Sequence, residues 1–241
     1  MNRIYIVGIG PGMTSAMTQD AEAALSGAGV IIGYSKYVEL IAEEFKGKEL
    51  LSTPMGGEID RCRMCFEKAA QNETVALVCS GDAGVYGLAS LMYELSREYE
   101  AELVVIPGVT AALSGAALLG APINNDFCVI SLSDLMTSWE RIENRLKAAA
   151  IGDFSVVIYN PGSHGRKDHL RRALGVMGEY VEGTRPCGWV RNIGRDGEEA
   201  HTCSFKELHE LSADMFTTVF IGASNSKIID GKLVTPRGYD V

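Results

Sequence analysis

Small residues and one carboxylate follow an apolar run in the segment Val75–Leu88, VALVCSGDAGVYGL. The apolar residues Val75–Cys79 predict a buried strand, and the turn after them contains Gly81 and Asp82. Glycines let a ligand approach the backbone because no Cβ is in the way. In open α/β folds, a turn of this kind at the carboxyl end of a strand binds nucleotide-like ligands. The pattern also fits an ordinary turn in which Asp82 caps a helix expected at Val85–Tyr99.

A second glycine-rich turn, Gly8–Gly12 with the sequence GIGPG, follows a strand predicted at Ile4–Val7. Its spacing departs from the dinucleotide-binding motif, because Met13 stands where that motif needs its third small residue. Pro11 removes a backbone N–H that a pyrophosphate would bind. No Asp or Glu follows the strand predicted at Val30–Ile32 to bind a ribose hydroxyl. An NAD-binding oxidoreductase is therefore a minor alternative, beside a nucleotide-binding module without catalytic activity.

The composition is 46% hydrophobic and 22% charged over 241 residues, which is typical of a globular protein with a full core. The formal net charge of −9 argues against nonspecific nucleic-acid binding, which needs a basic surface. No apolar run is long enough to cross a bilayer, and the first residues do not resemble a secretory signal. We therefore expect a cytoplasmic protein with neither a nucleic-acid nor a membrane partner.

Cys62 and Cys65 form the only C-x-x-C pair among the six cysteines of the chain. The pair lies inside a helix predicted at Glu58–Asn72, without the second pair or the nearby histidine that a zinc site needs. We interpret this pair as structural and predict no metal site, and we interpret the other four cysteines as small buried hydrophobes.

Apolar strand-like runs alternate with helical stretches along the chain, which predicts an α/β fold. Strands are expected at Ile4–Val7, Val30–Ile32, Val75–Cys79, Leu103–Ile106, Phe127–Leu132, Ser155–Tyr159, Gly188–Val190 and Thr217–Ile221. Helices are expected at Thr18–Ala28, Lys36–Phe45, Glu58–Asn72, Val85–Tyr99, Thr110–Leu119, Ser138–Ala149, Asp168–Tyr180 and Phe205–Leu211. The turn-rich segment Gly120–Asp126 predicts a boundary between two domains, residues 1–121 and 122–241.

Several turns along the chain share polar and small residues that are suited to ligand binding. They are GIGPG (Gly8–Gly12), GDAGVYG (Gly81–Gly87), PGVTAA (Pro107–Ala112), YNP (Tyr159–Pro161) and VRNIGRDGE (Val190–Glu198). Together they resemble the tetrapyrrole methylases, the class III methyltransferases that use S-adenosylmethionine, and the resemblance covers essentially the whole chain. The segment SLSDL (Ser131–Leu135) and the tail Thr217–Tyr239 resemble the subgroup that methylates C17 of a corrin precursor.

The resemblance implies two α/β domains with the cofactor in the cleft between them, usually in a homodimer, and a tetrapyrrole substrate. It implies contacts with S-adenosylmethionine from Gly10, Gly81, Asp82, Val85, Thr110, Ala111, Tyr159 and Asn160. It also implies C17 methylation coupled to ring contraction in cobalamin biosynthesis, with methylation of another ring carbon as the alternative within the family. Ala83 stands where many relatives have proline, which should loosen that turn slightly without removing a contact group.

Ring contraction expels a meso carbon, so an acid or a base should assist the reaction. Ser133, Asp134 and Arg191 are the catalytic candidates, because they lie in the segments that resemble the C17-methylating subgroup. Each of the three also fits an ordinary turn or surface residue.

A tetrapyrrole with many carboxylates calls for arginine partners. Arg191 and Arg195 are the better candidates, because they lie on a turn that contains glycines. Two other basic clusters, Arg61 with Arg63 and the segment Arg166–Arg172, are interpreted as solvated helix faces.

Overall fold

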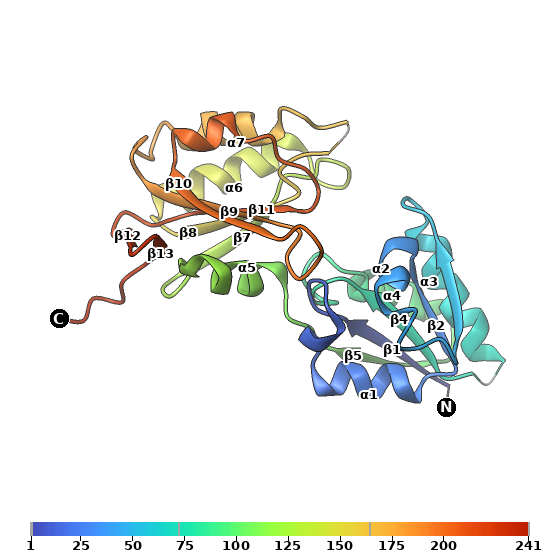
Figure 1. Cartoon of the computed structure of the whole chain (residues 1–241). Coiled ribbons are helices and arrows are strands. Elements are labelled where there is room, and N and C mark those ends of the chain that lie inside the picture. The colour runs from blue at the N-terminus through green and yellow to red at the C-terminus, as the bar shows by residue number, and fades with distance from the viewer. Residues whose placement is uncertain (1, 72, 164, 241) are drawn as a thin grey trace. The chain divides into compact units, whose positions relative to one another are not determined.

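The computed structural model describes residues 2–71, 73–163 and 165–240. The chain divides into two compact units, Met1–Ala111 and Ala112–Val241, and each contains a β-sheet with helices (Figure 1). The α/β prediction is confirmed. The division falls before the predicted boundary, since β6 (Gly120–Ala121) pairs with β13 (Lys232–Val234) of the second unit.

The first unit contains a five-stranded parallel sheet in the order β3-β2-β4-β1-β5. Its strands are β1 (Arg3–Gly8), β2 (Val30–Tyr34), β3 (Glu49–Thr53), β4 (Val75–Cys79) and β5 (Glu102–Ile106). Its helices are α1 (Gln19–Gly27), α2 (Ser35–Ile41), α3 (Glu58–Ala70) and α4 (Ala89–Leu95), with short 3-10 turns at Thr14–Ala16 and Ser96–Glu98. Every residue of β4 is buried, as expected for a strand that is covered on both faces.

Alternate side chains of the central strands pack against helices on opposite faces of this sheet. On one face Val7 and Val78 pack with α1 and α2, and on the other Ile6 and Leu77 pack with α3 and α4. The neighbouring strands β1 and β4 are thus followed by helices on opposite faces, which makes their junction a topological switch point. Ligands of open α/β sheets bind outside the carboxyl ends of the strands at such a point.

The second unit contains a mixed five-stranded sheet in the order β10-β9-β11-β8-β7 and a small sheet in the order β12-β13-β6. The strands of the larger sheet are β7 (Phe127–Ser131), β8 (Ser155–Tyr159), β9 (Pro186–Arg191), β10 (Glu199–Ser204) and β11 (Thr217–Ile221), and β12 is Lys227–Ile229. The helices are α5 (Ala111–Leu119), α6 (Trp139–Ile151) and α7 (His169–Met177), with a 3-10 turn at Glu207–Glu210.

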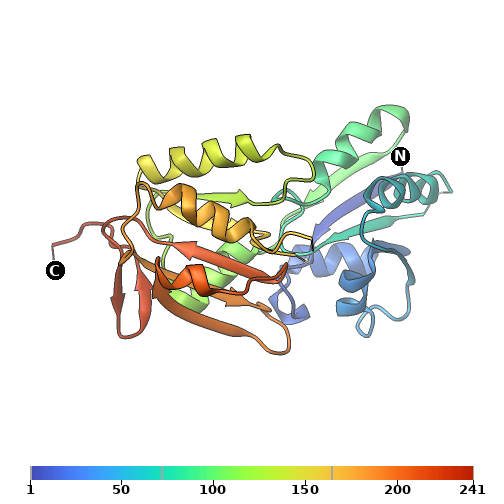
Figure 2. The same ribbon diagram turned by 90° about the horizontal axis from the view of Figure 1, so that it is seen from above.

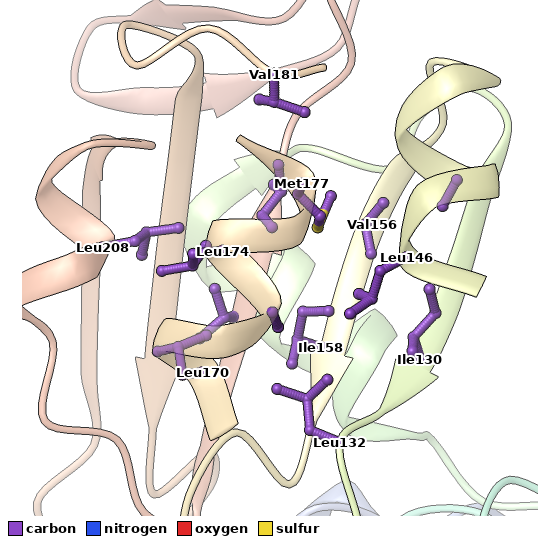
Figure 3. Packing of buried hydrophobic residues seen from close by; sticks show 14 of the residues in the cluster. Ile130, Leu132, Leu146, Val156, Ile158, Leu170, Leu174, Met177, Val181 and Leu208 are labelled. Carbon is purple, nitrogen blue, oxygen red and sulfur yellow. The ribbon is translucent and has the colours of Figure 1, made fainter. Parts of the chain in front are cut away.

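Helices α6 and α7 lie side by side over one face of the larger sheet (Figure 2). Figure 3 shows Leu146 of α6 and Leu174 of α7 beside Val156 and Ile158 of β8, and all four side chains are buried. Helix α5 packs closely against Phe220 of β11, since a Cβ at Gly115 would lie 2.9 Å from the ring atom Cζ. Glycine is therefore needed in α5 where it crosses this strand.

The predicted helix Val85–Tyr99 begins later than expected, at Ala89. Tyr86 has a left-handed backbone, with φ of 56°, and a Cβ at Gly87 would lie 2.7 Å from the carbonyl carbon of Ala83. A helix cannot continue through a residue in that conformation, so the turn keeps its own shape up to Leu88. Asn72, the expected last residue of the helix Glu58–Asn72, lies outside the described residues.

Substitution of Gly175 by alanine is expected to stabilise the protein by about 1 kcal/mol, because exposed glycine is unfavourable in a helix. Gly175 lies inside α7, and a Cβ there would meet nothing within 4 Å. Thermal unfolding should show Tm raised by roughly 2–4 °C. A lower Tm would show that the helix needs glycine at this position.

Candidate functional site

Three loops meet at the switch point of the first unit, and we call Gly8–Gly10, Gly81–Asp82 and Gly108 the three-loop junction. The Gly10 N–H donates to the Gly81 carbonyl at 3.0 Å, and the Gly81 N–H donates to the Gly10 carbonyl at 2.7 Å. Both glycines have positive φ, 76° and 69°. A Cβ at Gly8 would lie 2.7 Å from the backbone nitrogen of Gly108. The glycines therefore let the three backbones touch one another.

The Asp82 carboxylate connects the loops of the junction by accepting hydrogen bonds from backbone N–H groups. Its Oδ1 accepts hydrogen bonds from the N–H groups of Gly84 at 2.8 Å and Val85 at 3.2 Å. Its Oδ2 accepts from the N–H of Gly108 at 2.9 Å, which joins the loop after β4 to the loop after β5. Asp82 thus makes the capping contacts of an Asx turn and also links two candidate ligand-binding loops.

The structure brings together the six candidate cofactor residues of the first unit. Gly10, Gly81 and Asp82 form the junction, and Val85 is bonded to Asp82. Thr110 and Ala111 lie beside Gly81, since a Cβ built there would be 3.5 Å from the Thr110 Cα and 3.8 Å from the Ala111 nitrogen. The group combines backbone polar groups, one hydroxyl and one carboxylate, without a lysine or arginine.

The two candidate cofactor residues of the second unit follow one another at the carboxyl end of β8. The Tyr159 hydroxyl accepts a hydrogen bond from the Ala112 N–H at 2.6 Å, at the first turn of α5. Asn160 has a left-handed backbone with φ of 52°, and its Nδ2 donates to the Ser131 hydroxyl at 2.9 Å. These contacts fix both side chains within their own unit.

Ser133 and Asp134 are held by two basic side chains, Arg166 from the loop before α7 and His169 at the start of α7. The Arg166 Nη1 donates to the Ser133 hydroxyl at 2.7 Å and lies 3.9 Å from Asp134 Oδ1. The buried His169 places its Nε2 3.1 Å from Asp134 Oδ2, with its ring edge-on to Trp139. Arg166 and His169 therefore hold two catalytic candidates, whereas the sequence placed both on a solvated face.

The polar contact with His169 holds the pKa of Asp134 below its ordinary value, and the guanidinium of Arg166 acts in the same direction. A carboxyl whose pKa is lower in the folded state stabilises that state above its unfolded pKa, and the contribution is lost as pH falls through the folded pKa.

We expect Asp134→Asn to reduce the loss of stability below about pH 4, where this carboxyl would otherwise take up a proton. Urea unfolding at pH 6 and pH 3 checks this, with the exposed Asp168→Asn as the matched control. An equal pH dependence in wild type and Asp134→Asn would contradict it.

Arg191, the third catalytic candidate, belongs to a different cluster at the end of β9. Its Nη2 donates to the Ser212 carbonyl at 2.7 Å, and its Nε lies 3.8 Å from Asp214 Oδ2. Its guanidinium also lies 5.2 Å from the centre of the Trp189 ring. Strand β9 is three strands from β7, roughly 14 Å at the usual strand spacing, so Arg191 is not in contact with Asp134.

A pocket with a cavity volume of about 520 Å³ lies in the second unit between the segment Ser212–Phe216 and the loop after β8. Its lining includes Lys167, Asp214, Met215 and Phe216. The segment Ser212–Phe216 has no glycine motif that would mark it in the sequence, and it becomes part of a pocket only through the antiparallel pairing of β11 with β9.

Cys62 and Cys65 are fully buried, which fits a structural role, and Cys79 and Cys187 are buried as expected, whereas Cys128 and Cys203 are only partly buried. Burial raises the pKa of the Cys62 thiol to about 12, so this thiol stays protonated at neutral pH. Over the described parts of the chain, no group of three or more potential ligand side chains is placed to hold a metal ion. In the same parts, no helix is both long enough and apolar enough to span a membrane.

The interpretation of Arg61 and Arg63 as a solvated cluster is wrong for Arg61. Only 3% of Arg61 is exposed, whereas Arg63 is exposed. Positions 61, 65 and 69 share one face of α3, and Cys65 and Ala69 are buried. This helical spacing is the signal in the sequence that places Arg61 on the buried face.

The fold and these loops define a two-unit α/β protein whose candidate ligand groups lie at the carboxyl ends of its strands. The family model described as Tetrapyrrole (Corrin/Porphyrin) Methylases matches residues 3–209. The chain belongs to this family.

Individual relatives agree with this membership. The chain is 41% identical over 238 residues to a Salmonella typhimurium protein named probable cobalt-factor III C(17)-methyltransferase, covering 98% of this chain and 99% of that protein. It is also 41% identical over 239 residues to the cobalamin biosynthesis protein CbiHC of Archaeoglobus fulgidus, covering 98% of this chain but 53% of CbiHC. The chain thus spans about half the length of that relative. The crystal structure of the methyltransferase CobJ matches with a TM-score of 0.92 and 34% identity, covering 98% of this chain and 100% of that one.

Proposed function

We propose that this protein is an S-adenosylmethionine-dependent C17-methyltransferase of cobalamin biosynthesis. Its substrate is cobalt-factor III or the metal-free precorrin-3B, and methylation is coupled to ring contraction to the precorrin-4 level. The observation that carries the proposal is the 41% identity, over nearly the full length of both chains, to the Salmonella relative of that name. Membership of the methylase family favours this reaction over an NAD-dependent oxidation.

The three-loop junction fits S-adenosylmethionine chemically. Backbone amides and carbonyls with the Thr110 hydroxyl suit the adenine and ribose groups of the ligand, and the Asp82 carboxylate suits its positive sulfonium. We assign cofactor contacts to Gly10, Gly81, Asp82, Val85, Thr110 and Ala111 of the first unit, and to Tyr159 and Asn160 of the second. The bound cofactor supplies an electrophilic methyl group.

The protein's main contribution is then to orient the reacting carbon of the substrate, which can lower the barrier by about 7–11 kcal/mol at best. Ser133, Asp134 and Arg191 remain the candidates for the contraction step. Asp134 is the best placed to move a proton, because its Oδ2 lies 3.1 Å from the imidazole of His169. Arg191 is better suited to bind a substrate carboxylate through its guanidinium.

Anaerobic incubation with S-adenosylmethionine and either cobalt-factor III or precorrin-3B tests the proposal. Mass spectrometry should show the gain of one methyl group, absorbance should change with ring contraction, and the form that reacts identifies the substrate. Absence of turnover with both forms, in a protein that binds S-adenosylmethionine, would reject the C17 assignment and favour another ring carbon.

We also propose that the enzyme is a cytoplasmic homodimer, which the resemblance to the family supports. Light scattering after gel filtration should give a mass of about 52 kDa, twice the 25.9 kDa of the chain. A mass of one chain at working concentrations would reject the dimer.

A further inference from the structure

A second pocket lies in the first unit, at the carboxyl ends of β2 and β4, and has a cavity volume of about 160 Å³. Its lining includes Tyr34, Tyr37, Glu58, Arg61, Ser80 and Tyr86. Three of these are tyrosines and one is a buried arginine, so the pocket combines aromatic surface with a positive charge. The proposed cofactor assignment uses none of these residues.

The Arg61 guanidinium in this pocket has hydrogen-bond partners, but they are neutral. Its Nε donates to the Thr53 hydroxyl at 2.9 Å, and its Nη2 donates to the Pro54 carbonyl at 3.0 Å. Its Cζ lies 5.9 Å from the centre of the Tyr34 ring. Within residues 2–71, 73–163 and 165–240, no ion pair joins Arg61 to a carboxylate.

A cation that is 3% exposed and forms no ion pair with a carboxylate of the described residues is costly to bury. The two neutral acceptors use two of the five N–H donors of a guanidinium, so donors remain for a carboxylate. Guanidinium and carboxylate groups pair through two parallel hydrogen bonds. The ligand that best compensates Arg61 is therefore an anion with a carboxylate group.

The aromatic side chains of the pocket indicate what the ligand carries besides its carboxylate. Tyr34 and Tyr37 pack edge to face with ring centres 5.1 Å apart, and Tyr86 adds a third ring that is 55% exposed. Aromatic rings of this kind pack well against a flat heterocycle. The cavity is small, about 160 Å³, so it has room for a single ring and not for a whole tetrapyrrole.

We propose that this pocket binds one carboxylate-bearing pyrrole ring of the tetrapyrrole substrate, with Arg61 as the partner of the carboxylate. The inference rests on the proposed function and adds a substrate subsite to it. Ser80, Tyr86 and Leu88 of the lining belong to the same loop as Gly81 and Asp82, which places the subsite beside the proposed cofactor loop. The methyl donor also carries a carboxylate, but its sulfonium and ammonium charges make it a poorer partner for the buried guanidinium than a tetrapyrrole with several carboxylates.

Glu58 is the one carboxylate among the described residues that line the pocket. Its Oε1 accepts a hydrogen bond from the Gly56 N–H at 3.2 Å, and a glutamine oxygen can accept the same bond. Its negative charge opposes an anionic ligand. Glu58→Gln should therefore strengthen the binding of a carboxylated tetrapyrrole without disturbing the loop.

The test compares Arg61→Gln with Arg63→Gln, an exposed arginine on the same helix. Uroporphyrin III, a stable carboxylated tetrapyrrole, is the probe in a fluorescence titration, and calorimetry measures S-adenosylmethionine binding. Arg61→Gln should weaken uroporphyrin binding by about tenfold or more, since a charged hydrogen-bonded pair is lost. Its affinity for S-adenosylmethionine should stay unchanged, and Arg63→Gln should bind both ligands as wild type does.

Wild-type uroporphyrin affinity in a folded Arg61→Gln variant would overturn the proposal, as would a loss confined to S-adenosylmethionine. If Arg61→Gln does not fold, Glu58→Gln decides: tighter uroporphyrin binding supports the subsite, and unchanged or weaker binding rejects it. The probe binds without turnover. If the protein binds uroporphyrin through Arg61 but does not methylate C17, the subsite stands and only the proposed reaction is rejected.

Discussion

Replacement of Gly108 by alanine is expected to destabilise the first unit by about 3 kcal/mol or more, at the upper end for an overpacked site. The new Cβ would lie 2.5 Å from the Gly8 carbonyl oxygen and would also overlap the Gly81 carbonyl oxygen. Gly108 is not among the glycines with positive φ, so the cost comes from this overlap and not from backbone conformation. Both oxygens belong to backbone that the hydrogen bonds of the junction hold in place.

Thermal unfolding should show Tm lowered by roughly 6–12 °C, from the usual dependence of Tm on stability. Gly27→Ala is the matched control in the same unit, because a Cβ at Gly27 would meet nothing within 4 Å. Calorimetry should also show that Gly108→Ala has lost S-adenosylmethionine binding, since the loops must separate to admit the methyl group. A variant with the Tm of wild type would mean that the three backbones do not pack as closely as described.

Asp82→Ala is expected to lower the affinity for S-adenosylmethionine on the order of 100-fold, equivalent to about 2.7 kcal/mol. The substitution removes the acceptors of three backbone N–H groups, those of Gly84, Val85 and Gly108. The loops after β4 and β5 then lose the hydrogen bond that connects them. Cofactor binding must therefore order both loops, and this ordering lowers the affinity. The sheet and its two hydrophobic faces do not depend on Asp82, so the fold should persist.

Calorimetric titration with S-adenosylmethionine measures this effect, and circular dichroism checks the fold. Asp60→Ala is the control, because Asp60 is an exposed acid in the first turn of α3. The cofactor affinity of Asp82→Asn should lie between those of wild type and Asp82→Ala. The asparagine amide keeps one acceptor oxygen, but its NH₂ group replaces the other oxygen and cannot accept a hydrogen bond from a backbone N–H. Unchanged cofactor affinity in folded Asp82→Ala would remove Asp82 from the cofactor assignment.

The sequence predicted the strands in the middle of each sheet better than those at the edges. All eight predicted strands are present, because each is a nearly continuous apolar run. The edge strands β3 and β10 were not predicted, since ELLST and EAHTCS are half-exposed and carry polar residues. Strands β6, β12 and β13 are only two or three residues long, and their pairing depends on contacts far apart in the chain.

In the candidate site, too, residues were predicted where the signal is local in the sequence and missed where it depends on residues far apart in the chain. Gly81 and Asp82 were found because a glycine turn after a strand is a local pattern. The partners of Ser133 and Asp134 were not found, because Arg166 and His169 lie about thirty residues away and reach them only through the parallel pairing of β7 with β8. Arg61 was misinterpreted because it was grouped with its exposed neighbour Arg63, although its helical spacing from Cys65 and Ala69 places it on the buried face of α3.

The pairing of β6 with β13 has a consequence for the order in which the protein folds during synthesis. The first unit is one continuous segment of chain, so it can fold while the second is still on the ribosome. The second unit cannot complete its fold early in synthesis, because β6 (Gly120–Ala121) pairs with Lys232–Val234, which is synthesised much later. The buried Thr235 then donates its hydroxyl to the Pro122 carbonyl at 2.6 Å. Nascent chains that stop before these residues should therefore contain a folded first unit and an unfinished second one.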